Sequence, residues 1–471
     1  MTKRKKSTFE RLESGKWSRK ERRELQRLLC AAEPGLSVVH PHAAGIDVGN
    51  ESHFVAVPPD RDPQPVREFG SWTAALREMA EWLKSCGIRT VAMQSTGVYW
   101  VALQEVLEAA GLEVYLVNAR GTKNLPGRKS DVQECQWLLK LHTYGLLRNS
   151  FRPPEQIRAV RTVWRLRERW VQGAGRAVQQ MQKALTKMNV QLANTISDLS
   201  GATGMAILRA ILSGVRDPWQ LAKLRDRRIQ ASEAEIAASL EGNWREDVLF
   251  ELRQVMEGYD FYQRQIRGCD KELEKRMAAV PARQQGDPAN KLVRKMKPRG
   301  NQPGFDLAGE LRRTLGVDLT TVDGIDVMTA QVFLSEVGPE LSAFPSEDHF
   351  AAWLELAPRR DISGGKVIRH VKPDGRNRLA NALRMAAQSL SRSDSYLGAR
   401  YRSLRGRLGG QRAVKAMARY LACLLYRLLT KGQAYIDRGA DHFENKRLER
   451  ERVVLERRAA AHGFKLVPQS T

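Results

Sequence analysis

The sequence predicts an α/β domain near the N-terminus, a long helical coiled coil and a mostly α-helical C-terminal domain. Three observations lead to this fold class. Strand and helix patterns alternate over residues 41–150, an order that covers a sheet with helices. Apolar residues recur in steps of three and four over much of residues 151–280, as they do in coiled coils. Helical patterns then return over residues 316–435.

Size and charge limit the class of protein. A chain of 471 residues is too long for one hydrophobic core, so two or three domains are expected. The 78 Lys and Arg residues exceed the 53 Asp and Glu residues and give a net charge of +25. Nucleic acid is the expected partner, because each phosphate that a basic protein neutralises releases condensed counterions. Charge alone leaves open a merely soluble or ribosome-associated basic protein.

The cysteines and the apolar runs predict the compartment. The five cysteines lie far apart, without the spacing of a zinc site or of a disulfide framework. No apolar run approaches the roughly 18 residues that span a bilayer, and no apolar segment follows the basic N-terminus. We therefore expect a cytoplasmic protein that is neither exported nor bound to a membrane.

The first two predicted segments are a basic arm and the α/β domain. Residues 1–40 contain clusters of Lys and Arg, which are typical of a solvated arm or basic helix that contacts phosphates. The order of elements expected within residues 41–150 is a strand hairpin at 44–57, an apolar strand near 65–70, a helix at 74–83, a strand at 90–94, a helix at 99–110, a strand at 113–118 and a helix from about 131.

Residues 151–280 carry two runs of apolar residues with coiled-coil spacing. The first run extends over 171–192, and only Arg167 interrupts its continuation upstream. The second extends over 252–273. Such runs specify a seam that faces another helix. They could pair with each other or with a second protomer, because periodicity does not distinguish the two arrangements.

Three segments complete the predicted organisation. Residues 281–315 are basic and rich in proline and glycine, as in a linker. Residues 316–435 are predicted to form the mostly helical domain, in which Arg405, Arg412 and Lys415 belong to a basic helix interrupted by a Gly-Gly pair. This helix favours a nucleic-acid surface. Residues 436–471 are predicted to form a charged helix and tail without a wide apolar face.

Four residues of the α/β domain could bind a divalent metal ion. Asp47 lies inside an apolar strand that turns back as a second strand, and Gln94 ends a later strand. Asp131 and Glu134 stand at i and i+3 on one helix face. This layout is typical of an RNase H-like nuclease sheet, in which central acids hold the metal ions that stabilise charge during phosphodiester cleavage. Any single acid could instead be a surface residue or a helix cap.

A second candidate site lies at residues 359–366, with the sequence Arg-Arg-Asp-Ile-Ser-Gly-Gly-Lys. The two glycines that follow Ser363 leave room for its hydroxyl to approach a phosphate. By itself, Ser-Gly-Gly-Lys is a common loop sequence. Nearby cations that could hold the phosphate are Arg359, Arg360, Lys366 and Arg369.

These blocks resemble the DEDD transposases of bacterial insertion sequences, family 110 and its relatives, which include the Piv DNA invertases. The resemblance runs from about residue 41 to residue 435. It implies that residues 41–150 form a RuvC-like DEDD nuclease domain and that residues 316–435 form a transposase domain with a catalytic serine loop. This chain departs from the family at two metal positions, since Gln94 replaces a glutamate and Glu134 replaces an aspartate.

The resemblance implies a transposase or site-specific recombinase that cuts and rejoins DNA through a phosphoserine formed by Ser363. Asp47, Gln94, Asp131 and Glu134 would be catalytic residues that hold Mg²⁺ or Mn²⁺. The implied partners are donor DNA, target DNA, a structured non-coding bridge RNA and further copies of the chain in a dimer or tetramer. The implied location is the bacterial cytoplasm, in association with the nucleoid.

Two other functions remain open at this stage. One is a RuvC-like, metal-dependent junction nuclease that hydrolyses DNA strands with water and forms no covalent adduct. The other is a non-catalytic nucleic-acid-binding descendant of a transposase, because the neutral side chain of Gln94 can ligate a metal ion without neutralising its charge. A covalent protein-DNA adduct separates the transposase from both alternatives.

Overall fold

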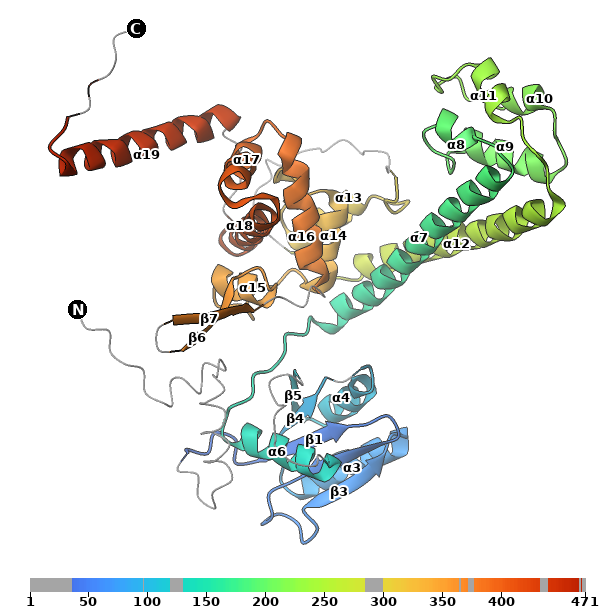
Figure 1. The fold of residues 1–471 in the computed structure, drawn as a ribbon. Coiled ribbons are helices and arrows are strands. Elements are labelled where there is room, and N and C mark those ends of the chain that lie inside the picture. The colour runs from blue at the N-terminus through green and yellow to red at the C-terminus, as the bar shows by residue number, and fades with distance from the viewer. Residues whose placement is uncertain are drawn as a thin grey trace. The chain divides into compact units, whose positions relative to one another are not determined.

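The computed structural model describes residues 36–95, 97–118, 130–283, 300–363, 366–371, 377–432, 439–465 and 467. Most of the expected basic arm at residues 1–40 therefore lies outside the described residues. The chain divides into two compact units, one within Met1–Arg152 and Arg359–Lys372 and the other within Pro153–Pro358 and Pro373–Thr471. The first is a mixed α/β unit, and the second is helical (Figure 1).

The first unit is built on a five-stranded sheet with the strand order β3-β2-β1-β4-β5. β1 pairs antiparallel with β2, which pairs antiparallel with β3, whereas β1 pairs parallel with β4, which pairs parallel with β5. Each strand lies where an apolar run predicts it. The strands are β1 (Ala43–Val48), β2 (Ser52–Ala56), β3 (Val66–Gly70), β4 (Thr90–Gln94) and β5 (Glu113–Val117).

Helices cover both faces of this sheet. The helices are α3 (Thr73–Ser85), α4 (Trp100–Ala109) and α6 (Asp131–Thr143). Ile46 and Met93 are paired neighbours on β1 and β4, and they join one buried core with Leu83 of α3 and Leu103 of α4. Because side chains alternate across a strand, the residues next to Ile46 and Met93 face the other side of the sheet. There α6 packs against β1, β2 and β4.

The second unit contains two helices of 33 residues each, α7 (Glu155–Lys187) and α12 (Glu246–Ala278). They pack side by side along their length (Figure 1). The direction is antiparallel, because Arg167 bonds Asp270 at one end of the pair and Lys187 bonds Glu251 at the other. The two runs of apolar residues therefore pack against each other within one chain.

Arg167, which interrupts the apolar register, lies inside this helix pair. Its side chain is only 2% exposed, and its Nε donates to Asp270 Oδ1 at 2.5 Å. Asp270 also accepts from the backbone nitrogen of Gly304, which follows the segment 284–299 in the sequence. A buried charge is tolerated when it is paired and hydrogen-bonded, so Arg167 is a buried polar anchor in the seam.

Short helices close the far end of the helix pair. They are α8 (Leu192–Thr195), α9 (Ala202–Leu212), α10 (Pro218–Ala222) and α11 (Glu233–Ser239). Their buried apolar residues form one core with the ends of α7 and α12, including Met181, Leu185 and Leu252. Asp217 caps α10 by accepting from Trp219 N, and Ser232 and Glu235 form a capping box on α11.

The remaining helices form a bundle in the second unit. They are α13 (Leu307–Leu315), η1 (Leu319–Thr321), α14 (Val327–Glu336), α15 (Glu347–Trp353), α16 (Arg378–Ser389), η2 (Leu390–Arg392), α17 (Tyr396–Leu408), α18 (Gly410–Lys431) and α19 (Gly439–Ala461). Ion pairs join this bundle to α7, because Arg165 bonds Glu336 of α14 at 2.7 Å and Glu168 bonds Arg378 of α16. α19 is the charged helix expected from the sequence.

Two details differ from the sequence-based expectations. The segment 281–315 is not all linker, since its last residues form α13, which Asp306 caps by accepting from Gly309 N. The domain at 316–435 also contains a two-stranded hairpin of β6 (Arg359–Ser363) and β7 (Lys366–Val371). This hairpin belongs to the same compact unit as the five-stranded sheet.

Candidate active site

The position of α6 on the sheet depends on a glycine in β1. A Cβ atom on Gly45 would lie 2.3 Å from the carbonyl oxygen of Cys135 and 2.3 Å from the backbone nitrogen of Leu139. Cβ atoms essentially never lie closer than 3.0 Å to other atoms, so only glycine allows the helix to lie this close to the strand. The sequence shows Gly45, but one chain does not reveal this contact.

The same close packing places Asp47 near the first turns of α6. Asp47 lies two residues beyond Gly45 and therefore faces the same side of the sheet. β1 pairs with β4 through Gly45 with Ala92 and Ile46 with Met93, and the next step of this register sets Asp47 beside Gln94. Gln94 is buried, and its Nε2 lies 3.5 Å from Glu134 Oε2. The structure thus brings Gln94 and Glu134 together, and the register of β1 and β4 sets Asp47 on the strand next to Gln94.

Asp131 stands one turn before Glu134 and is exposed. The cap of α6 is Ser130, whose Oγ accepts from the backbone nitrogen of Gln133 at 3.3 Å, so Asp131 is not the capping residue. Both acids lie in the first turn of α6, where the helix dipole favours negative charge. The structure therefore explains how two carboxylates are stabilised at this point without assigning Asp131 to the cap.

Cys135 lies beneath these acids and was not among the residues expected at the site. Burial, together with the negative charges of Asp47 and Asp131, raises the pKa of its thiol to about 12. The thiol is thus protonated at neutral pH and is a poor nucleophile. Asp47 and Asp131 thus both act on this buried thiol.

The donor atoms at this edge suit a hard divalent cation, because Mg²⁺ and Mn²⁺ prefer carboxylate and amide oxygens. Within the described ranges, no three His, Cys, Asp or Glu side chains gather as a metal-binding group. Asp47, Asp131 and Glu134 therefore do not form such a group in this structure. Gln94 supplies an amide where a fourth acid is expected, and Asp131 is exposed. The residues present fit such an ion in chemistry, with fewer negative charges than four acids would provide.

The serine-bearing segment forms a strand rather than a simple loop. Ser363 is the last residue of β6 and pairs with Lys366, the first residue of β7. The two glycines between them, at 364–365, lie outside the described residues. The side chains of Arg359, Arg360 and Ser363 are likewise not described, so the structure places only their backbone. Lys366 and Arg369 are exposed on β7.

The expected basic surface lies on α17 and α18. Gly409 has a φ angle of 77° and separates the two helices, as the Gly-Gly pair predicts. Arg405, Arg412 and Lys415 are all exposed. Other cations of this region make internal contacts, for example Arg419 with Asp348 at 2.7 Å. The exposed residues are therefore the ones available to a polyanion.

An exposed apolar pair follows the strand that carries Gln94. Val98 and Tyr99, between β4 and α4, are 74% and 44% exposed. The sequence suggests only a helix start at this point, because such a pattern does not reveal exposure. Large apolar side chains in solvent beside a charged site are suited to contact nucleic-acid bases.

Two family models match the chain. A DEDD family model of the IS110 type, described as a transposase, matches residues 44–190, which include the five-stranded sheet and all of α7. A second model, described as the transposase IS116/IS110/IS902 family, matches residues 318–402, which include the β6–β7 hairpin. No curated protein matches the chain. Within the described residues, no helix combines the length and apolar character needed to cross a membrane.

The two matched models describe the two halves of one kind of transposase, and they occur here in the order that the sequence motifs predict. The first match extends past the boundary expected near residue 150, because it includes the helix that leads into the second unit. The chain belongs to the IS110 family of transposases.

Proposed function

We propose that this transposase cuts and rejoins DNA through a covalent serine intermediate. Ser363 Oγ attacks a phosphodiester phosphorus, and the bond from phosphorus to the 3′ oxygen breaks. The hydroxyl proton leaves Oγ, and the departing oxygen takes up a proton and becomes a 3′ hydroxyl. A different 3′ hydroxyl then attacks the phosphoserine, restores the phosphodiester and releases the serine. The bond energy is retained in the ester, so no ATP is required.

The observation that carries this proposal is that Gln94 lies beside Glu134 and, by the register of β1 and β4, next to Asp47. These residues lie where α6 packs closely on Gly45. The strand order and directions support an RNase H-like, RuvC-like domain, because the acids then lie on the central strands and on the helix that covers them. The hairpin that bears Ser363 belongs to the same compact unit as this sheet.

Each group has a proposed role. Asp47, Asp131, Glu134 and the amide oxygen of Gln94 would hold Mg²⁺ or Mn²⁺. The ion, when bound, would supply positive charge to the reacting phosphate. Lys366 and Arg369 would anchor that phosphate through charge-assisted hydrogen bonds, together with Arg359 and Arg360.

The proposed partners follow from the family and from the charge. Transposases act on DNA, and we assign donor and target DNA to Arg405, Arg412 and Lys415 of α17 and α18. A structured bridge RNA is proposed from the resemblance alone. Assembly into a dimer or tetramer is also proposed. Because Leu185 is buried in the internal core, this assembly would use surfaces other than the seam between α7 and α12.

Detection of a covalent adduct tests the proposal. The full chain is incubated with its element-end DNA, the RNA encoded beside its gene and Mg²⁺, and is then denatured in detergent. We expect an adduct that is lost in Ser363→Ala and in Asp47→Asn, whereas Ser363→Ala still binds DNA. Ser85→Ala is a matched control in the same unit, because the Ser85 hydroxyl bonds the Trp82 carbonyl and has no role in the proposed reaction.

Three outcomes would contradict the serine mechanism. An adduct that persists in Ser363→Ala would place the nucleophile on another residue. Metal-dependent cutting with no adduct at any time would favour the water-using junction nuclease. DNA binding without cutting or adduct would favour a non-catalytic descendant, a function consistent with the amide of Gln94 pointing at Glu134.

A further inference from the structure

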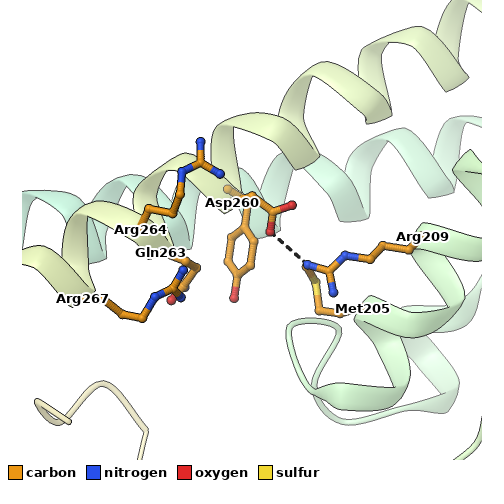
Figure 2. Close-up of a pocket in the computed structure, with 7 residues that line it drawn as sticks. Met205, Arg209, Asp260, Gln263, Arg264 and Arg267 are labelled. Carbon is orange, nitrogen blue, oxygen red and sulfur yellow. Dashed lines mark hydrogen bonds and ion pairs between the residues drawn. The ribbon is translucent and has the colours of Figure 1, made fainter.

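A basic pocket lies between α9 and α12, at the end of the helix pair that the short helices close. Its volume is about 390 Å³. Figure 2 shows Met205 and Arg209 projecting from α9 toward the residues of α12. None of its lining residues belongs to the candidate active site or to the basic surface of α17 and α18. Those on α12 are Tyr259, Asp260, Gln263, Arg264 and Arg267.

The charges in the pocket do not cancel. Arg209 is held by Asp260, whose Oδ1 lies 3.0 Å from its NH2 group (Figure 2). Arg264 and Arg267 are exposed, and within the described residues neither has an ion-pair or hydrogen-bond partner. Three arginines and one aspartate line the pocket, so its net charge is +2. Two of the guanidinium groups are therefore free to bind an anion.

The helix geometry directs these groups to one place. Asp260, Gln263, Arg264 and Arg267 occupy positions i, i+3, i+4 and i+7 of α12, which form one helix face. Tyr259 is half-buried against the neighbouring core. Burial, with the charge of Asp198, raises the pKa of Tyr259, so its hydroxyl remains protonated at neutral pH and can donate a hydrogen bond.

We propose that this pocket binds the phosphodiester backbone of a nucleic-acid strand, with Arg264 and Arg267 as the ionic contacts. Both guanidinium groups are planar fork donors that match phosphate oxygens. They are also exposed, so solvent and salt screen their attraction for a single phosphate. The site therefore needs a strand with many phosphates. The net charge of +25 attracts such a strand to the surface of the protein.

This proposal does not depend on Ser363, because it concerns binding alone. The strand could be RNA or DNA, and the phosphate chemistry is the same for both. Comparing single-stranded RNA, single-stranded DNA and duplex DNA of matched sequence distinguishes them. If one probe binds more tightly than the others, and charge reversal in the pocket removes this difference, that probe identifies the kind of strand bound. Equal loss with all probes assigns a general backbone contact.

The experiment measures the affinity of the full chain for these probes over a range of salt concentrations. Arg264→Glu with Arg267→Glu is compared with the control Arg176→Glu with Lys183→Glu. The control residues are exposed on α7 and do not line this pocket, and the two pairs change the net charge equally. We expect the pocket pair to lower the slope of log affinity against log salt by about one per lost contact. The control pair should have a smaller effect.

A substitution that removes a negative charge from the pocket makes the complementary test. Asp260→Asn removes the carboxylate that occupies Arg209, so it should tighten binding severalfold and steepen the salt slope by about one. Circular dichroism and melting curves check that each variant is folded. Equal losses in the two charge-reversal pairs, or unchanged binding in Asp260→Asn, would overturn the proposal.

Adduct formation separates this proposal from the catalytic one. At nucleic-acid concentrations that saturate the pocket variant, the Ser363 adduct should form to the extent seen in the parent. A lost adduct at saturating binding would instead make these arginines part of the reaction, and would contradict a site used only for binding.

Discussion

Replacing Gly45 with alanine is the most direct perturbation of the candidate active site. The added methyl group would lie 2.3 Å from two backbone atoms of α6 and 2.9 Å from the Leu139 Cα. Backbone atoms cannot turn aside as a flexible side chain can. Since ordinary contacts of this kind are about 3.5–4.0 Å, α6 would have to move away from β1 by about 1 Å.

That movement has an energetic and a functional cost. Overpacking of a close contact costs about 1–3 kcal/mol and occasionally more, which corresponds to a melting-temperature decrease of about 2–8 °C per kcal/mol in domains of this size range. Asp131 and Glu134 would move with the helix, whereas Asp47 and Gln94 would stay on the sheet. A displacement of about 1 Å between catalytic groups can reduce a rate by about 100-fold.

Calorimetry and the adduct assay measure both effects in the full chain. Gly175→Ala is the matched control, since no atom lies within 4 Å of a Cβ added at this position in α7, and alanine there should stabilise the helix by up to about 1 kcal/mol. We expect Gly45→Ala to melt earlier and to form little adduct while it still binds DNA. Parent-like melting and adduct formation would refute the close packing of α6 on β1.

Three further predictions rest on buried polar groups. Gln94→Glu should have a lower melting temperature than the parent in chelator and a larger increase in melting temperature on addition of Mg²⁺, because like charges about 4 Å apart repel by roughly 1–4 kcal/mol until an ion neutralises them. Equal increases in both proteins would place position 94 away from the ion. Arg167→Met should destabilise the helix pair by about 3–5 kcal/mol in urea unfolding, because it leaves the charge of Asp270 unpaired. The double variant Arg167→Met with Asp270→Leu should recover most of the lost stability. No recovery would contradict the pairing. Burial, with the charge of His40, lowers the pKa of His142 from 6.5 to about 3, so the unfolded chain binds more protons than the folded chain between these pH values. The free energy of unfolding should therefore fall by up to about 1.4 kcal/mol per pH unit as the pH decreases from 6.5. His142→Gln should flatten this pH dependence.

Much of the fold could be predicted from the sequence because local patterns are sufficient for it. The strands of the sheet carry short runs or alternations of apolar residues bounded by polar or turn residues, and each lies where expected. The β6–β7 hairpin was not expected, because its strands are polar and its glycine pair is typical of a loop. The assignment of this hairpin to the first unit depends on contacts between residues far apart in the sequence, which no local pattern encodes.

The candidate site was predicted in part for the same reason. The acids could be found because each stands at a strand end or helix start, where chain order indicates a shared edge. The roles of Gly45 and Cys135 were not found, because both depend on how closely α6 packs on the sheet. In the sequence, Arg167 is only an interruption of the register. Its partner Asp270 lies 103 residues away, and a single sequence does not show that the two residues meet.

Gln94 shows where composition and geometry must be considered together. From the sequence, an amide in place of a carboxylate only removes one negative charge from the metal site. In the structure the same amide is buried and directs its NH2 group toward Glu134, so it stands where a carboxylate would repel Glu134. We therefore expect the amide to stabilise this edge without an ion and to lower its affinity for one. Stability in chelator and response to Mg²⁺ should therefore change in opposite directions when position 94 becomes acidic.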